Sequence, residues 1–249
     1  MAQRKIQFML MSWLLLAIIP AGFIITQISL FPGISLDGAS SSLLYWITRS
    51  GNAPDGALTV VVVLLLGLFY LPRRIFRRLV LALIISLTLS LSLSHQLKNY
   101  FQEPRPNIVW LASQDLLSVP GFYQQPSSQR AELMSSALQR MDASQLISPS
   151  IERHWEKEVG YAFPSGHTIF ATTLALVAAY YFLSAGFILI PVIICGWSLA
   201  MGLSRMLLGM HWPVDVLVSV LLAGMISALA IGVTHRLGLM LKKRDQPTR

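Results

Sequence analysis

The stretch IQFMLMSWLLLAIIPAGFIIT, residues 6–26, runs for 21 residues without a charged side chain. The hydrocarbon core of a bilayer is about 30 Å thick and takes about 20 helical residues to cross, so this stretch predicts a membrane-spanning helix. Arg4 and Lys5 precede it, as in a secretory signal peptide. The apolar run is longer than in a typical signal peptide, however, and no small-residue cleavage motif follows. We therefore expect a retained helix.

Five further apolar stretches have the composition of membrane spans. They cover approximately residues 57–71, 79–97, 168–183, 187–203 and 214–234. Of the 249 residues, 54% are hydrophobic and only 12% are charged, against about 25% charged in an ordinary soluble domain. This composition excludes a soluble globule, and backbone hydrogen bonding in lipid requires each span to be a helix. The sequence predicts an all-α polytopic membrane protein with six transmembrane helices, folded as one domain over residues 1–249.

Charged residues divide unequally between the two sides of this topology. The side with both termini carries 11 Lys and Arg and one acid, a net charge of +10. The other side carries 8 Lys and Arg and 10 acids, a net −2, and the two sides together give the overall +8. Because cytoplasmic loops are rich in Lys and Arg, both termini are expected in the cytoplasm. The basic balance is then a topology signal, and we expect contact with the lipid bilayer and no nucleic-acid binding.

A polar insert of about residues 107–160 separates the third and fourth spans on the outer side. Apolar residues at helical spacing over residues 131–145 predict an amphipathic helix that lies on the membrane or over a site. Pro149 after Ser148 predicts the start of a second short helix, since Pro suits the first turn. The insert is therefore expected to be α-helical and to cap an active site beneath it.

The first of three polar clusters is KNYFQEPRP, residues 98–106, directly after the third span. Pro104 and Pro106 bar a continuing helix, which leaves Lys98 at a helix end and Arg105 in an extended segment. Two cations that approach from different backbone directions can clamp a phosphate. The simpler alternative is that both are interfacial cations that reach the lipid headgroups.

The second cluster is FPSGHT, residues 163–168, at the start of the fourth span. Gly166 allows close backbone approach, and the free N–H groups of a helix start attract anions. Ser165 can add a hydroxyl donor, and His167 would lie beside the bound anion. The alternative is an ordinary helix start with an incidental histidine.

The third cluster is SRMLLGMHWPVD, residues 204–215, between the last two spans. His211 and Asp215 are four residues apart, which lets their side chains meet. A carboxylate on one imidazole nitrogen fixes the tautomer and leaves the other nitrogen free to attack. The alternative is a surface His–Asp pair without a role. All three clusters fall on the same side of the membrane, which favours one shared site.

Together the patterns K-x6-R-P, P-S-G-H and S-R-x5-H-x3-D resemble the type 2 phosphatidic acid phosphatase superfamily, and all three match without substitution. The stretches EPRPNIVWL and HWEKEVGYAFPSGHT resemble its bacterial branch that acts on phosphatidylglycerophosphate. The resemblance implies a lipid phosphatase of the bacterial inner membrane with its site at the periplasmic face. It also implies phosphatidic acid, diacylglycerol pyrophosphate and undecaprenyl pyrophosphate as further substrates.

The resemblance implies a role for each residue of the clusters. His211 would attack phosphorus to give a phosphohistidine, and Asp215 would orient it. His167 would protonate the leaving oxygen and then activate water. The residues that would bind the phosphoryl oxygens are Lys98, Arg105, Ser165, Gly166 and Arg205. Because His211 must be neutral and His167 protonated, a bell-shaped pH–rate profile is expected.

No cofactor or metal is expected. The cations can take the electrostatic role of Mg²⁺, and the few nearby acids do not form the oxygen cage that Mg²⁺ needs. The single cysteine excludes an intrachain disulfide and a C-x-x-C site. In the insert we expect His154, Glu156 and Glu158 on a solvated loop face, and Trp110 and Trp155 in an ordinary aromatic belt.

Three other activities and one non-enzyme role compete with this hypothesis. A lipid phosphotransferase or a dedicated undecaprenyl pyrophosphate phosphatase could use the same motifs. Vanadate-binding haloperoxidases of the superfamily are soluble, so six spans argue against them. A lipid transporter or scaffold would be expected to show repeats and charges at mid-membrane, whereas here the charges cluster at one face. The sequence does not determine the oligomeric state.

Overall fold

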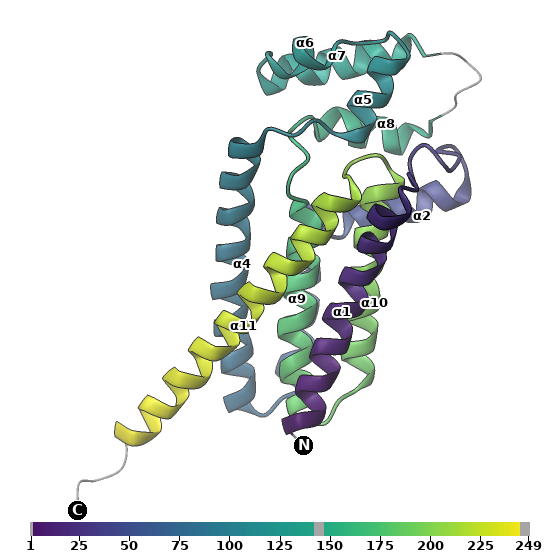
Figure 1. Ribbon diagram of the computed structural model, residues 1–249. Coiled ribbons are helices and arrows are strands. Elements are labelled where there is room, and N and C mark those ends of the chain that lie inside the picture. Colours follow the sequence, from purple (N-terminus) through teal and green to yellow (C-terminus); the bar gives the residue numbers. More distant parts are fainter. Residues whose placement is uncertain (1, 142–146, 245–249) are drawn as a thin grey trace, which may run out of the picture.

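A computed structural model describes residues 2–141 and 147–244 of the chain. Over these residues the chain forms eleven helices and no β-strand, which confirms the all-α prediction. In Figure 1 the long helices stand side by side as a bundle, and four short helices lie across one end of it. We call these four helices, α5 to α8, the cap, and the end that they cover the capped end.

Six helices of the bundle correspond to the six expected spans. Their bounds are α1 Ala2–Thr26, α3 Asp55–Tyr70, α4 Arg73–Phe101, α9 Gly166–Ser184, α10 Leu189–Leu207 and α11 Pro213–Arg244. Five are long and apolar enough to cross a membrane, whereas α3 has only 16 residues. Its outward side chains are apolar nevertheless, since Leu65, Leu68 and Phe69 are exposed. The multi-pass membrane fold is confirmed, and the count of six spans stays a prediction.

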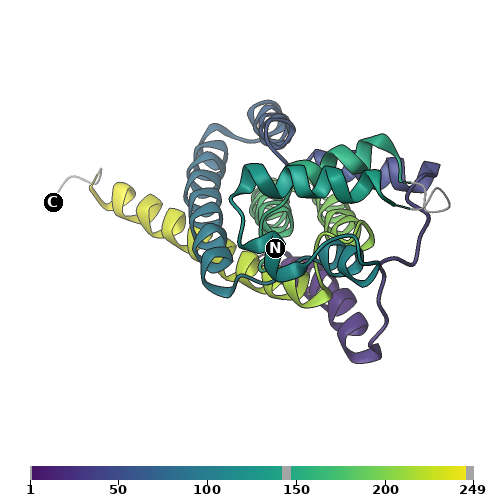
Figure 2. The ribbon, with the colours of Figure 1, turned by 90° about the horizontal axis from the view of Figure 1, so that it is seen from above.

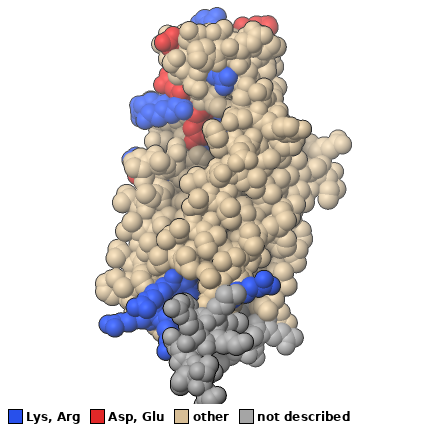
Figure 3. Space-filling view, turned by 90° about the vertical axis from the view of Figure 1, so that its left-hand side faces the viewer, with Lys and Arg blue, Asp and Glu red and all other residues tan. Residues whose placement is uncertain are grey.

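Charged side chains avoid the middle of the bundle. Figure 3 shows Lys and Arg near one end, both signs of charge at the capped end, and a wide uncharged band between them. Helix α4 follows this pattern, with four arginines in its first six residues and Lys98 in its last turn. An uncharged band of this kind suits the hydrocarbon layer of a membrane.

Helix α9 forms the centre of the bundle and packs against α4, α10 and α11. Alanines such as Ala171, Ala175 and Ala178 are fully buried on it, and small side chains let membrane helices approach closely. Hydroxyl groups also link the helices. Ser90 Oγ lies 3.1 Å from Thr173 Oγ1, and Thr172 Oγ1 lies 3.0 Å from Ser198 Oγ. Dense packing therefore fixes the start of α9, which carries the second polar cluster.

The cap consists of the expected helical insert. Its helices are α5 Pro106–Ser113, α6 Val119–Tyr123, α7 Ser127–Gln139 and α8 Pro149–Lys157, and Figure 2 shows them from above. The amphipathic helix predicted over 131–145 is α7, which begins earlier and ends earlier; residues 142–146 lie outside the described residues. Its buried Met134 and Ala137 belong to an apolar core that includes residues of α8. Helix α8 begins at Pro149, as predicted.

An aromatic cluster packs the cap against the bundle. Trp155 of α8 is fully buried and lies edge-to-face with Phe31 and with Trp110 of α5. Its Nε1 donates a hydrogen bond of 3.1 Å to the carbonyl oxygen of Leu208, at the end of α10. The aromatic-belt prediction is therefore wrong for Trp155, because a buried indole with a buried acceptor is part of a core. This contact holds α8 over the third polar cluster.

Candidate active site

The three polar clusters meet at the capped end. Every expected residue lies at or near a helix end or in the loop beside one. Lys98 and Arg205 are in the last turns of α4 and α10, and Arg105 directly precedes α5. Ser165, Gly166 and His167 lie at the start of α9, His211 lies in the loop after α10, and Asp215 lies in the first turn of α11. Figure 1 shows these helix ends beneath the cap. The fold thus gathers residues that are more than 100 positions apart in the chain.

His211 and Asp215 form a buried pair. His211 Nδ1 lies 3.3 Å from Asp215 Oδ2, and the same oxygen accepts a 2.9 Å hydrogen bond from the backbone N–H of Trp212. Burial lowers the pKa of His211 well below its usual value, and the charges of Arg205, Arg105 and Lys98 lower it further. His211 is therefore neutral near pH 7, and its Nε2 can carry a lone pair while Nδ1–H faces the carboxylate.

Glu158, at the end of α8, connects the cations of two clusters. Its Oε2 accepts hydrogen bonds from Arg105 Nη1 at 3.0 Å and from Arg205 Nη2 at 2.5 Å. Its Oε1 lies 3.3 Å from His167 Nε2. The side chain is only 12% exposed, so the expected solvated loop face is wrong for Glu158. Two buried guanidinium groups need a counter-charge, and the cap supplies it.

The electrostatics of this cluster follow from burial and charge. Burial raises the pKa of the Glu158 carboxyl, but Arg205, His167, His154 and Arg105 outweigh it, and the pKa lies well below its usual value. Burial lowers the pKa of His154 to about 4. His154 Nε2 lies 2.9 Å from Arg205 Nη1, so a neutral His154 accepts a hydrogen bond from that guanidinium. The solvated-face expectation is thus wrong for His154 also.

The remaining expected residues have partners of their own. Lys98 Nζ donates to the carbonyl oxygen of Tyr161 at 2.6 Å, in the segment that leads to α9. Ser165 caps α9: its Oγ accepts from the backbone N–H of Thr168 at 3.3 Å. Its own N–H donates to Ser219 Oγ at 2.9 Å. Lys98 and Ser165 therefore also hold the second cluster in place.

Several buried polar atoms of the site have no hydrogen-bond partner among the described residues. They are His167 Nε2, Arg205 Nε and Asp215 Oδ1. Buried polar atoms are nearly always paired in folded proteins. His167 Nε2 and Arg205 Nε can donate to a ligand with several oxygens, whereas Asp215 Oδ1 is an acceptor and does not suit one. Among the side chains that the structure describes, no three of His, Cys, Asp or Glu are arranged to hold a metal ion. That the reaction needs no metal stays a prediction.

Comparison with known proteins decides the family. Residues 79–238, which include all three clusters, match the PAP2 superfamily. The chain belongs to the PAP2 superfamily. It is similar to phosphatidylglycerophosphatase B of Escherichia coli K12, with 32% identity over 78% of this chain and 76% of the relative. It is also similar to phosphatidylglycerophosphatase B of Haemophilus influenzae, with 34% identity over 80% of this chain and 84% of the relative.

This PAP2 protein is therefore a multi-pass membrane lipid phosphatase, a hydrolase of phosphoric monoesters. The relatives are bacterial, and the apolar helices suit the inner membrane. Sequence analysis missed Glu158 and His154 as parts of the PAP2 site. A signal was present, since two arginines at membrane ends require an acid and Glu158 lies only nine residues before His167.

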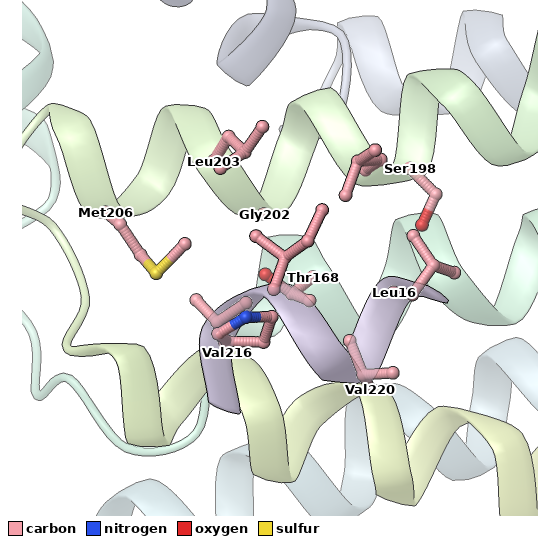
Figure 4. Close-up of a pocket in the computed structure, with 11 residues that line it drawn as sticks. Leu16, Thr168, Ser198, Gly202, Leu203, Met206, Val216 and Val220 are labelled. Carbon is pink, nitrogen blue, oxygen red and sulfur yellow. The ribbon is translucent and has the colours of Figure 1, made fainter. Parts of the chain in front are cut away.

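The PAP2 bundle also contains a small apolar pocket, drawn in Figure 4. Its labelled lining residues, among them Leu16, Thr168, Met206 and Val220, come from α1, α9, α10 and α11. It has room for about one water molecule, with a volume of about 10 Å³. The pocket has no charged lining residue, so it is a packing gap and not a phosphate site.

Proposed function

We propose that this phosphatase hydrolyses phosphatidylglycerophosphate to phosphatidylglycerol and inorganic phosphate through a phosphohistidine at His211. The names of the two relatives support the substrate. The observation that carries the mechanism is the buried His211–Asp215 pair, whose histidine is neutral and lies in the field of nearby cations. A neutral imidazole oriented by a carboxylate is a competent nucleophile, and fixed cations stabilise charge on the transferring phosphoryl group.

The reaction takes two steps. In the first, His211 Nε2 bonds to phosphorus while the bond from phosphorus to the lipid oxygen breaks, and His167 gives its proton to that oxygen. Asp215 stabilises the positive charge that His211 acquires. In the second, His167 takes a proton from water, the water oxygen bonds to phosphorus, and the phosphorus–nitrogen bond breaks. Phosphate leaves, and His211 is neutral again.

The phosphoryl group takes the place that the Glu158 carboxylate holds between Arg105 and Arg205. A phosphate offers the same guanidinium groups more oxygens than a carboxylate does. It can also accept hydrogen bonds from Arg205 Nε, which is buried without a hydrogen-bond partner among the described residues, and from His167 Nε2, which lies 3.3 Å from Glu158 Oε1 in this structure. Further phosphoryl-binding groups are Lys98, Ser165 and the amide of Gly166. The cap must therefore move Glu158 aside when a lipid phosphate binds.

The lipid reaches the site sideways from the membrane. A cavity of about 420 Å³ lies between α3, α4 and α9, and its lining is mostly apolar. Leu87, Leu91 and Phe170 line its walls, and Gly166 and His167 line it at the site. Acyl chains can occupy such a cavity while the headgroup phosphate meets His167. With both termini in the cytoplasm, as the charge distribution indicates, this site faces the periplasm.

A phosphate-release assay with four lipids tests the proposal. Purified protein is offered phosphatidylglycerophosphate, phosphatidic acid, diacylglycerol pyrophosphate and undecaprenyl pyrophosphate side by side. We expect free phosphate from all four and the highest kcat/KM for phosphatidylglycerophosphate. Hydrolysis of undecaprenyl pyrophosphate alone, or transfer of phosphate to another lipid without release, would contradict it. A chelator should leave turnover unchanged; loss of turnover that Mg²⁺ restores would refute the metal-independent mechanism.

A further inference from the structure

A second cavity adjoins both the site and the apolar cavity described above. It has a volume of about 250 Å³ and lies between the end of α2 (Ala39–Arg49), the turn that follows it and α8. Its polar lining residues include Tyr45, Arg49, Asn52, Arg153, His154 and Lys157. We call it the polar cavity. We call the apolar cavity between α3, α4 and α9 the lipid cavity. The polar cavity differs from it in chemistry, because three lining residues of the polar cavity are Lys or Arg and the lipid cavity has none.

The two cavities meet beside Glu158 and the residues that pair with it. They share Asn52 and Ala53 as lining residues, and Asn52 Nδ2 donates to Glu158 Oε1 at 3.3 Å. His154 lines the polar cavity and His167 lines the lipid cavity, with ring centroids 6.5 Å apart. The Glu158 carboxylate therefore lies between an apolar opening and a cationic one.

The cations of the polar cavity are only partly balanced by acids. Arg49 pairs with Asp55 at 2.7 Å. Arg153 and Lys157 are exposed, and neither forms an ion pair with any residue that the structure describes. They are four residues apart on α8, a spacing at which like charges repel. A doubly charged anion between them removes that repulsion and gains two charge-assisted contacts.

We propose that the polar cavity binds inorganic phosphate and is the route by which this product leaves the site. The inference rests on the hydrolysis proposed above, which yields one lipid and one small dianion. The lipid product stays in the lipid cavity. Phosphate leaves Arg205, passes the neutral His154 and reaches Arg153 and Lys157 in the polar cavity. Phosphate can then occupy this cavity while the next lipid is already bound.

Product inhibition tests this directly. Phosphate that returns to the site between Arg105 and Arg205 competes with the lipid substrate and raises the apparent KM for the lipid. Phosphate in the polar cavity blocks departure while lipid is bound, and so lowers kcat as well. In the double variant Arg153→Gln, Lys157→Gln, the effect on kcat should need about tenfold more phosphate. The competitive effect should not change.

Two matched controls separate this role from general surface charge. Arg140→Gln removes an exposed cation of the cap whose guanidinium, among the residues that the structure describes, donates only to the backbone carbonyls of Ser136 and Leu116. It should behave as the parent protein. The exchange Arg153→Lys, Lys157→Arg keeps both charges and should keep the effect on kcat. Purely competitive inhibition of the parent, or an unchanged kcat effect in the double variant, overturns the proposal.

Equilibrium dialysis with labelled inorganic phosphate tests the cavity without turnover. The parent protein should bind two phosphates, and the double variant should bind one. Equal stoichiometry in both proteins overturns the phosphate site even if hydrolysis is observed. If no lipid is hydrolysed but the second phosphate is lost in the double variant, the proposed function fails and the anion site stands.

Discussion

Two polar groups at the capped end differ in how the chain builds them. The His211–Asp215 pair joins residues four apart in one short segment. The Glu158 cluster joins residues 47 and 53 positions apart, from the cap and the bundle. In the mechanism proposed above, the pair stays together throughout the reaction, whereas the cluster must open to admit phosphate. In that mechanism the nucleophile is preformed, and the phosphate-binding site is held closed by its own counter-ion.

The largest effect is expected from breaking the pair at the nucleophile. His211→Ala should lower kcat by at least about 10⁴-fold, because it removes the imidazole on which the proposed covalent intermediate forms. Phosphate release by purified protein measures this, and circular dichroism should show unchanged helix content. Near-normal turnover in this variant would remove His211 as nucleophile.

Asp215→Asn breaks the same pair at its other end and should do less harm. The amide keeps the shape of the carboxylate but carries no charge to stabilise the His211 imidazolium. Its NH₂ group can also favour the wrong tautomer of His211, with the proton on Nε2. We expect kcat to fall by about 10²-fold or more, with a small change in KM. A loss confined to KM would instead mean that Asp215 serves substrate binding.

The Glu158 cluster should respond differently. Glu158→Gln leaves Arg105 and Arg205 without their buried counter-charge, which costs on the order of 3 kcal/mol of unfolding free energy. The same change removes the competitor of the phosphoryl group, so inorganic phosphate should bind about tenfold tighter. Thermal unfolding with and without phosphate measures both, since phosphate should restore the lost stability.

Glu156→Gln is the matched control, because Glu156 lies on the same helix and forms no ion pair with the described residues. It should change neither stability nor phosphate affinity. Unchanged phosphate affinity in Glu158→Gln would contradict the view that the carboxylate holds the site closed.

The smallest effect is a pH dependence. Burial and neighbouring cations hold the pKa of folded His211 well below 6.5. The unfolded chain therefore takes up this proton first, and stability falls as pH drops below about 6.5. For the same reason the acid limb of kcat/KM should lie below pH 6.5. A pH–rate profile checks this, and an acid limb above pH 6.5 would contradict a neutral, buried nucleophile.

The comparison also explains what could be predicted from sequence. The apolar composition of residues 79–97 and 214–234 alone predicts that they are spans, because an apolar segment in lipid must be helical. The motifs predicted His211 beside Asp215 because the two residues are only four positions apart, and the contact forms although His211 lies in the loop directly before α11. Both inferences use local information, and the structure agrees with both.

The parts that sequence missed are non-local. Glu158 reads as one acid among several in a polar insert, and only the packing of α8 over the bundle makes it the partner of Arg105 and Arg205. Trp155 likewise reads as an interfacial aromatic, although its indole is buried against Leu208. Composition cannot show which polar residues of an insert become buried, because burial depends on how the cap docks.

The most direct test of the central claim is to trap the covalent intermediate. Protein is mixed with phosphatidylglycerophosphate that carries a radiolabelled terminal phosphate, and the reaction is quenched with alkali within one turnover. The account predicts an alkali-stable, acid-labile phosphate on His211 that is absent from His211→Ala. Release of phosphate in the first turnover with no label on the protein, or with label on another residue, would contradict it.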